Sequence, residues 1–161
     1  MKNPPRWRRA GVVTAVVLTL LTAVGCAPGT PDGDSWRIDA QRAVADASTA
    51  VQTAELALRL HGHDRIFDRY LQTVLVEAEK GIGTASTAIG SKQPPRAERE
   101  RYDTVTGQIG EAASLISTTR IAVVDRETSR YDALADRLAD AAAALSRLED
   151  DLQHPPVRTA G

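Results

Sequence analysis

The chain has a single cysteine and few aromatic residues. One cysteine among 161 residues excludes an internal disulfide and also haem attachment through a Cys-x-x-Cys-His motif. Aromatic residues make up 4% of the sequence, so a core must come mostly from Ala, Val, Leu and Ile. The sequence contains no Glu-x-x-His pair, no Gly-x-Ser-x-Gly elbow and no phosphate-binding loop. We therefore expect no cofactor and no enzymatic activity.

Basic residues are also scarce once the N-terminus is set aside. Residues 1–25 contain four basic residues and no acidic one, so residues 26–161 carry 16 basic residues (20 − 4) against 21 acidic ones, a formal charge of −5. Non-specific nucleic-acid binding needs a basic face, so we expect no nucleic-acid partner. Arginine greatly outnumbers lysine and alanine is abundant. This bias is typical of GC-rich genomes and favours an actinobacterial source.

The only strongly apolar run, residues 10–24, lies near the N-terminus. It has 15 residues (24 − 10 + 1), fewer than the roughly 20 that a helix needs to cross a bilayer. Basic residues precede it, and it leads into Leu21-Thr22-Ala23-Val24-Gly25-Cys26. This arrangement resembles a bacterial lipoprotein signal peptide that ends in a lipobox. The resemblance implies cleavage before Cys26, diacylglycerol on its sulfur and anchoring to the outer face of the membrane. A secreted protein and an uncleaved signal anchor are the alternatives.

The sequence predicts four regions. Residues 1–25 form the signal peptide, and residues 26–35 form the lipidated cysteine and a flexible tether, because Gly, Pro and Asp crowd this stretch. Residues 36–153 form one helical domain. Residues 154–161 form a disordered tail, because His154-Pro155-Pro156 ends the last helix.

Apolar residues within the domain follow the 3-4 spacing of amphipathic helices. We expect helices over residues 36–61 and 64–89, a third from residue 96, and a fourth up to residue 153. Their buried stripes are Val44, Ala47, Val51, Ala54 and Leu58; Phe67, Leu71, Val74, Ala78, Ile82, Ala85 and Ile89; Tyr102, Val105, Ile109, Ala112, Ile116, Thr119 and Val123; and Tyr131, Leu134, Leu138, Ala141, Leu145, Leu148 and Leu152. The last two stripes are out of phase by one residue.

Three breaks separate these helices. Gly62 has the place of a left-handed residue after the first helix, and Asp64 that of an N-cap for the second. Pro94-Pro95 separates the second and third helices. The change of phase lies over residues 125–129 and has two possible explanations. One is a turn, with Thr128 or Ser129 as the N-cap of the next helix. The other is a continuous helix with a phase shift. The fold expected is an all-α, up-down-up-down four-helix bundle, with a long two-helix antiparallel hairpin as the alternative.

One cluster has the composition of a metal site. His61, His63 and Asp64 could converge across the Gly62 turn, and Asp68 could add an oxygen ligand. No third histidine is near them in the sequence, and zinc or copper sites usually need three or four ligands. A polar helix connection is the alternative interpretation, and we expect no metal. Trp36 opens the domain beside the tether, where it could cover the end of the bundle or enter the lipid headgroups.

These features favour a membrane-anchored, extracytoplasmic lipoprotein. Its expected role is a helical protein-binding or scaffolding module in the cell envelope, with the membrane contacted through lipid on Cys26 and an envelope protein as partner. A small-ligand or metal-binding bundle that acts as carrier or sensor is the alternative. A homo-oligomer is a further possibility.

Overall fold

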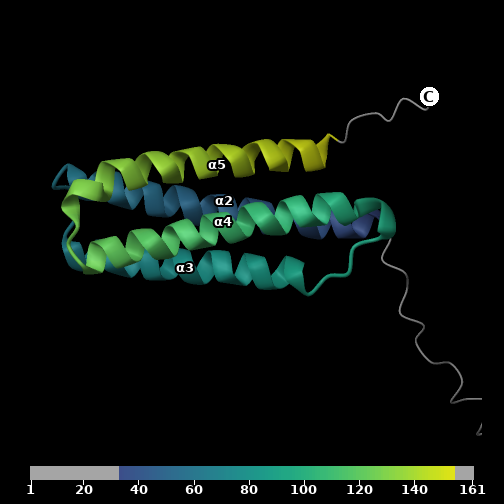
Figure 1. Cartoon of the computed structure of the whole chain (residues 1–161), viewed down its shortest axis with the longest axis horizontal. Helices are drawn as coiled ribbons and strands as arrows, with labels where there is room; N and C mark the ends of the chain where they lie inside the picture. Colours follow the sequence, from purple (N-terminus) through teal and green to yellow (C-terminus); the bar gives the residue numbers. More distant parts are fainter. Residues whose placement is uncertain (1–32, 155–161) are drawn as a thin grey trace, which may run out of the picture. The chain divides into compact units, whose positions relative to one another are not determined.

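The computed structural model describes residues 33–154. The signal peptide, Cys26 and the tail over residues 155–161 lie outside the described residues. Within them the secondary structure is entirely helical. Four α-helices and two short 3₁₀ helices follow one another (Figure 1): α2 (Gly33–Gly62), α3 (Asp68–Gly90), η1 (Arg96–Glu98), α4 (Arg99–Val124), η2 (Thr128–Arg130) and α5 (Tyr131–Gln153).

The α-helices form the expected up-down-up-down four-helix bundle. Helix α2 packs against α3 and α5, and α4 packs against α3 and α5. The two-helix hairpin is wrong, because the chain turns back between α2 and α3 and again between α4 and α5 (Figure 1). We call the end that holds Gly33, the α3–α4 connection and Gln153 the Gly33 end. The opposite end, with the α2–α3 and α4–α5 connections, is the His61 end.

The predicted stripes form most of the core. All five expected residues of α2 are buried, and most of the α4 and α5 stripes are buried as well. The α3 stripe needs a correction, because Phe67 is 87% exposed and Leu75, which we did not include, is fully buried. Phe67 is the N-cap residue of α3 and has an extended backbone, with φ −84° and ψ 155°. Its side chain therefore does not continue the helical stripe. Val74, Tyr102 and Ala141 are only partly buried against the core.

The two turns at the His61 end have the same backbone design. Arg65 N–H donates to the Leu60 carbonyl at 2.9 Å, and Asp64, with φ 55°, is left-handed between them. In the second turn Glu127 N–H donates to the Ala122 carbonyl at 2.9 Å, and Arg126 has φ 56°. Both are Schellman motifs, which satisfy carbonyls at a helix C-terminus.

These turns correct three predictions about the helix ends. Gly62 is not left-handed, since it is the last residue of α2 and no glycine within residues 33–154 has a positive φ. Asp64 occupies the left-handed position and is not an N-cap. Neither Thr128 nor Ser129 caps α5, whose N-cap residue is Arg130 without a side-chain hydrogen bond. The turn after residue 124 is confirmed, and a continuous helix there is wrong.

The start of α2 also differs from the prediction. Gly33, Asp34 and Ser35 belong to the helix, although the sequence placed them in the tether. Asp34 lies in the first turn and forms an ion pair with Arg37. Trp36 is 2% exposed, so it covers the end of the core and does not project toward lipid headgroups. Its buried Nε1 has no hydrogen-bond partner within the described part of the chain.

Candidate functional site

His61 lies where three helices meet at the His61 end. Its Nε2 is 2.7 Å from Oδ1 of Asp68, the first residue of α3. Its ring also meets the ring of Tyr131, the first residue of α5, edge to face at 5.7 Å between centroids. The hydrogen bond from His61 lowers the pKa of Asp68, and burial raises the pKa of Tyr131. His61 therefore joins α2 to both neighbouring helices.

The structure does not assemble the predicted metal candidates into a ligand set. His63 and Asp64 are exposed, and their backbone N–H groups donate to the carbonyls of Arg59 and His61. Over residues 33–154, no group of three or more His, Cys, Asp or Glu side chains lies close enough together to hold a metal ion. His61 forms its side-chain contact with Asp68 and not with His63 or Asp64. His63 and Asp64 lie in the connection between α2 and α3.

Apolar side chains are exposed beside this connection. Phe67 is 87% exposed and Tyr70 is 59% exposed, while Ile66 is partly buried against the core. Together with His61 and Asp68 they line a shallow hollow of about 720 Å³. We call Ile66, Phe67 and Tyr70 the Phe67 surface. Large aromatic side chains in such positions are typical of protein-binding surfaces.

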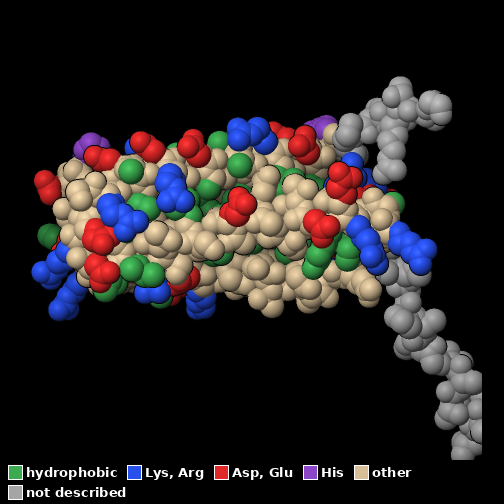
Figure 2. All heavy atoms as spheres, in the orientation of Figure 1, with side chains coloured by type: hydrophobic (Ala, Val, Ile, Leu, Met, Phe, Trp, Pro, Cys, Tyr) green, Lys and Arg blue, Asp and Glu red, His purple; other side chains and the backbone are tan. Residues whose placement is uncertain are grey.

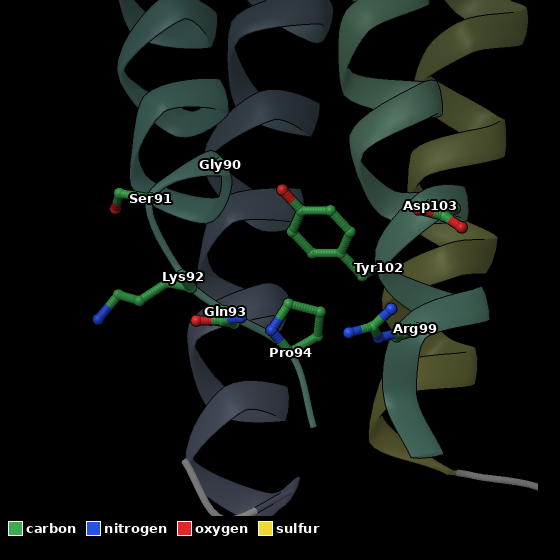
Figure 3. A pocket seen from close by; sticks show the side chains of 8 residues that line it. All are labelled: Gly90, Ser91, Lys92, Gln93, Pro94, Arg99, Tyr102 and Asp103. Carbon is green, nitrogen blue, oxygen red and sulfur yellow. The ribbon is translucent and has the colours of Figure 1, made fainter. Parts of the chain in front are cut away.

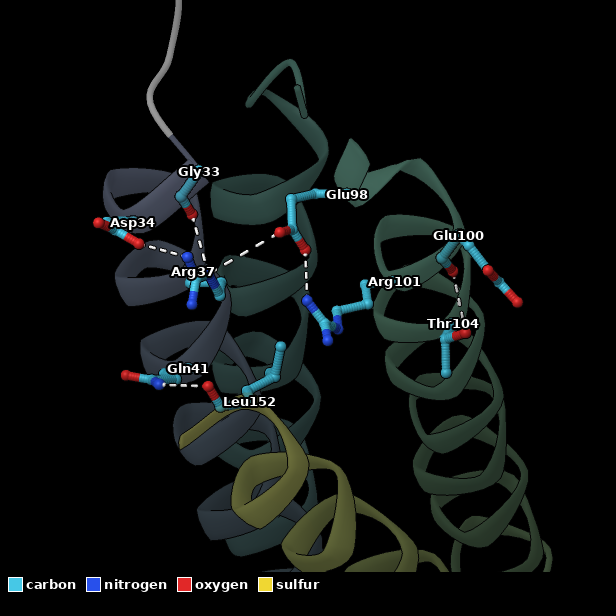
Figure 4. Close-up of polar contacts among 9 residues, drawn as sticks. All are labelled: Gly33, Asp34, Arg37, Gln41, Glu98, Glu100, Arg101, Thr104 and Leu152. Carbon is cyan, nitrogen blue, oxygen red and sulfur yellow. Dashed lines mark hydrogen bonds and ion pairs between the residues drawn. The ribbon is translucent and has the colours of Figure 1, made fainter. Parts of the chain in front are cut away.

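The Gly33 end is held together by a buried carboxylate (Figure 4). Glu98, which lies in η1, is 6% exposed. Its carboxylate is 2.8 Å from Nη1 of Arg101 and 3.9 Å from Nε of Arg37, which lies on α2. Gln41 of α2 also donates to the Leu152 carbonyl of α5 at 2.9 Å. These contacts connect the start of α2 to the α3–α4 connection and to the end of α5.

A second hollow lies at the Gly33 end (Figure 3). It has a volume of about 440 Å³ between the α3–α4 connection and the first turns of α4. The ring of Tyr102 points across it toward Gly90 and Ser91. Lys92 on its rim is already 2.9 Å from Asp39.

The chain belongs to the class of all-α four-helix bundles. Comparison with known proteins does not assign it to a narrower family. No family model, no curated protein and no solved structure matches it. None of the helices over residues 33–154 is both long and apolar enough to cross a membrane. Charged side chains of both signs cover the face of the bundle seen in Figure 2, with apolar side chains exposed between them.

Proposed function

We propose that the chain is a lipid-anchored, extracytoplasmic envelope protein that binds a protein partner through the Phe67 surface. The observation that carries the proposal is the position of Phe67. A serine or aspartate at this N-cap would stabilise α3 by about 0.5–2 kcal/mol. Phe67 makes no cap hydrogen bond and contributes little to the core. A phenylalanine with neither role in folding fits a role in binding.

The chemistry of the surface supports a protein partner. Phe67 and Tyr70 together expose a large apolar area, and its removal from water would stabilise a complex by about 25 cal/mol per Å². Charged residues, among them Asp64 and Arg69, line the same hollow. An apolar centre with a polar rim is the arrangement common in protein interfaces.

The anchor rests on the lipobox, and its position suits this surface. Cys26 precedes Gly33 by seven residue steps (33 − 26), which span at most about 25 Å. The Gly33 end therefore stays close to an anchor on Cys26. The Phe67 surface lies at the other end of the bundle, where a chain anchored through Cys26 can present it to a partner in the envelope.

Photo-crosslinking in cells tests the partner. A benzophenone amino acid replaces Phe67, and the matched control carries it at Ile38, which is 56% exposed and lies near the Gly33 end. We expect one envelope protein to be crosslinked from position 67 and not from position 38. The same products from both positions, or a product that contains only a second copy of the chain, would contradict the proposal.

Lipidation needs its own test. Cells are fed an alkyne-labelled fatty acid, and we expect the wild-type chain, but not the Cys26→Ala variant, to carry the label. Equal labelling of both would remove the anchor from the proposal. The crosslinking result would still decide whether the Phe67 surface binds a partner.

A further inference from the structure

A cleft between α4 and α5 is separate from the Phe67 surface. Its volume is about 280 Å³, close to the lower limit of about 300 Å³ for small-molecule sites. Leu115 and Leu145 form its floor and are buried. Gln108 and Glu111 on α4, and Arg137 and Asp140 on α5, supply its polar groups. Side chains of both charge signs are visible along this seam in Figure 2.

The polar groups of the cleft lack partners. The Oε1 atom of Gln108 is buried and accepts no hydrogen bond from any described residue. Buried polar atoms in folded proteins are nearly always hydrogen-bonded, because an unpaired one is costly. Glu111, Arg137 and Asp140 are exposed to solvent and take part in none of the ion pairs within residues 33–154, so their charges are available to a ligand.

The spacing of these residues divides the cleft into two walls. Gln108 and Glu111 are three residues apart on α4, and Arg137 and Asp140 are three residues apart on α5. Residues at this spacing are neighbours on one face of a helix. The cleft thus presents three oxygen acceptors, on Gln108, Glu111 and Asp140, and one guanidinium above an apolar floor.

We infer that this cleft binds a small zwitterion of the amino-acid type with an apolar side chain. A primary ammonium group has three N–H donors, which match the oxygens of Gln108, Glu111 and Asp140. The planar guanidinium of Arg137 suits a carboxylate, which it can bind through two parallel hydrogen bonds. The apolar side chain of the ligand covers Leu115 and Leu145.

Three related probes test the inference on the full-length protein in detergent, by isothermal titration calorimetry. L-Leucine carries both charges, isoamylamine is leucine without the carboxylate, and 4-methylpentanoate is leucine without the ammonium group. We expect L-leucine to bind at least about tenfold more tightly than either of the others, since a hydrogen bond to a charged group supports such a difference. Equal affinity for all three, or no binding of L-leucine, would overturn the inference.

Variants assign the two charges. R137Q should weaken L-leucine binding by about tenfold and leave isoamylamine binding no weaker. The double variant E111Q/D140N should weaken both. R147Q is the matched control for R137Q, and E149Q/D150N is the matched control for E111Q/D140N, because each makes the same change of charge on α5 outside the cleft. Loss of L-leucine binding in either control, with helicity unchanged by circular dichroism, would show that general charge and not the cleft is responsible. None of these measurements depends on the anchor or the Phe67 surface.

Discussion

Replacement of Phe67 by serine should make the domain more stable. Phe67 hides only 13% of its surface (100 − 87). Full burial of a phenylalanine is worth about 1.5–3 kcal/mol, so the substitution loses about 0.2–0.4 kcal/mol. Serine at the N-cap of α3 would gain about 0.5–2 kcal/mol by accepting from an N–H of the first turn. The net change is a gain of about 1 kcal/mol.

Urea unfolding followed by circular dichroism measures this change in the free energy of unfolding. The control is Leu75→Ala, at a fully buried position of the same helix, which should cost about 2–5 kcal/mol. If Phe67 were a core residue, Phe67→Ser would instead destabilise by more than about 3 kcal/mol. A loss of that size would refute both the exposure of Phe67 and the binding role proposed for it.

Three further predictions concern the turns and helices. Arg126→Gly should stabilise by about 1 kcal/mol in urea unfolding, because a left-handed backbone suits glycine, and a destabilised variant would contradict the φ of 56°. Gly83→Ala should add about 1 kcal/mol, since the new methyl group meets open space; calorimetric melting would show a higher melting temperature, and a lower one would indicate a neighbour at this position. Asp68, whose pKa His61 lowers, should contribute stability above its ordinary pKa of 3.8 and lose it as the pH falls below that value. Asp68→Asn should abolish this part of the acid dependence, and an unchanged pH profile would exclude the His61 contact.

The core could be predicted from the sequence because one periodicity governs each helix. Val51, Ile116 and Leu138 lie in the middle of predicted stripes and are fully buried. The shift of one residue between the last two stripes predicted a break, and the chain turns there. Helical spacing contains this information because a side chain at every third or fourth position faces the same way.

The exposed Phe67 could not be predicted in this way. Nothing in residues 64–67 prevents a helix from starting at Asp64. The start at Asp68 follows from the Schellman motif, in which Asp64 is left-handed and Arg65 bonds back to Leu60. The cleft could not be predicted from the sequence either, because Glu111 and Arg137 look like ordinary solvated charges on separate helices. Only the packing of α4 against α5 brings them to one site.

The length of the antiparallel helices also sets a distance. Helix α2, which begins at the Gly33 end, has 30 residues, which at 1.5 Å per residue corresponds to a rod of about 45 Å. In a chain anchored through Cys26, at most about 25 Å of connecting backbone adds to that length. The reach of such an anchored domain would end about 70 Å from the lipid. Insertions between Cys26 and Gly33 would extend that reach without altering the bundle, and so would measure how deep in the envelope the proposed partner lies.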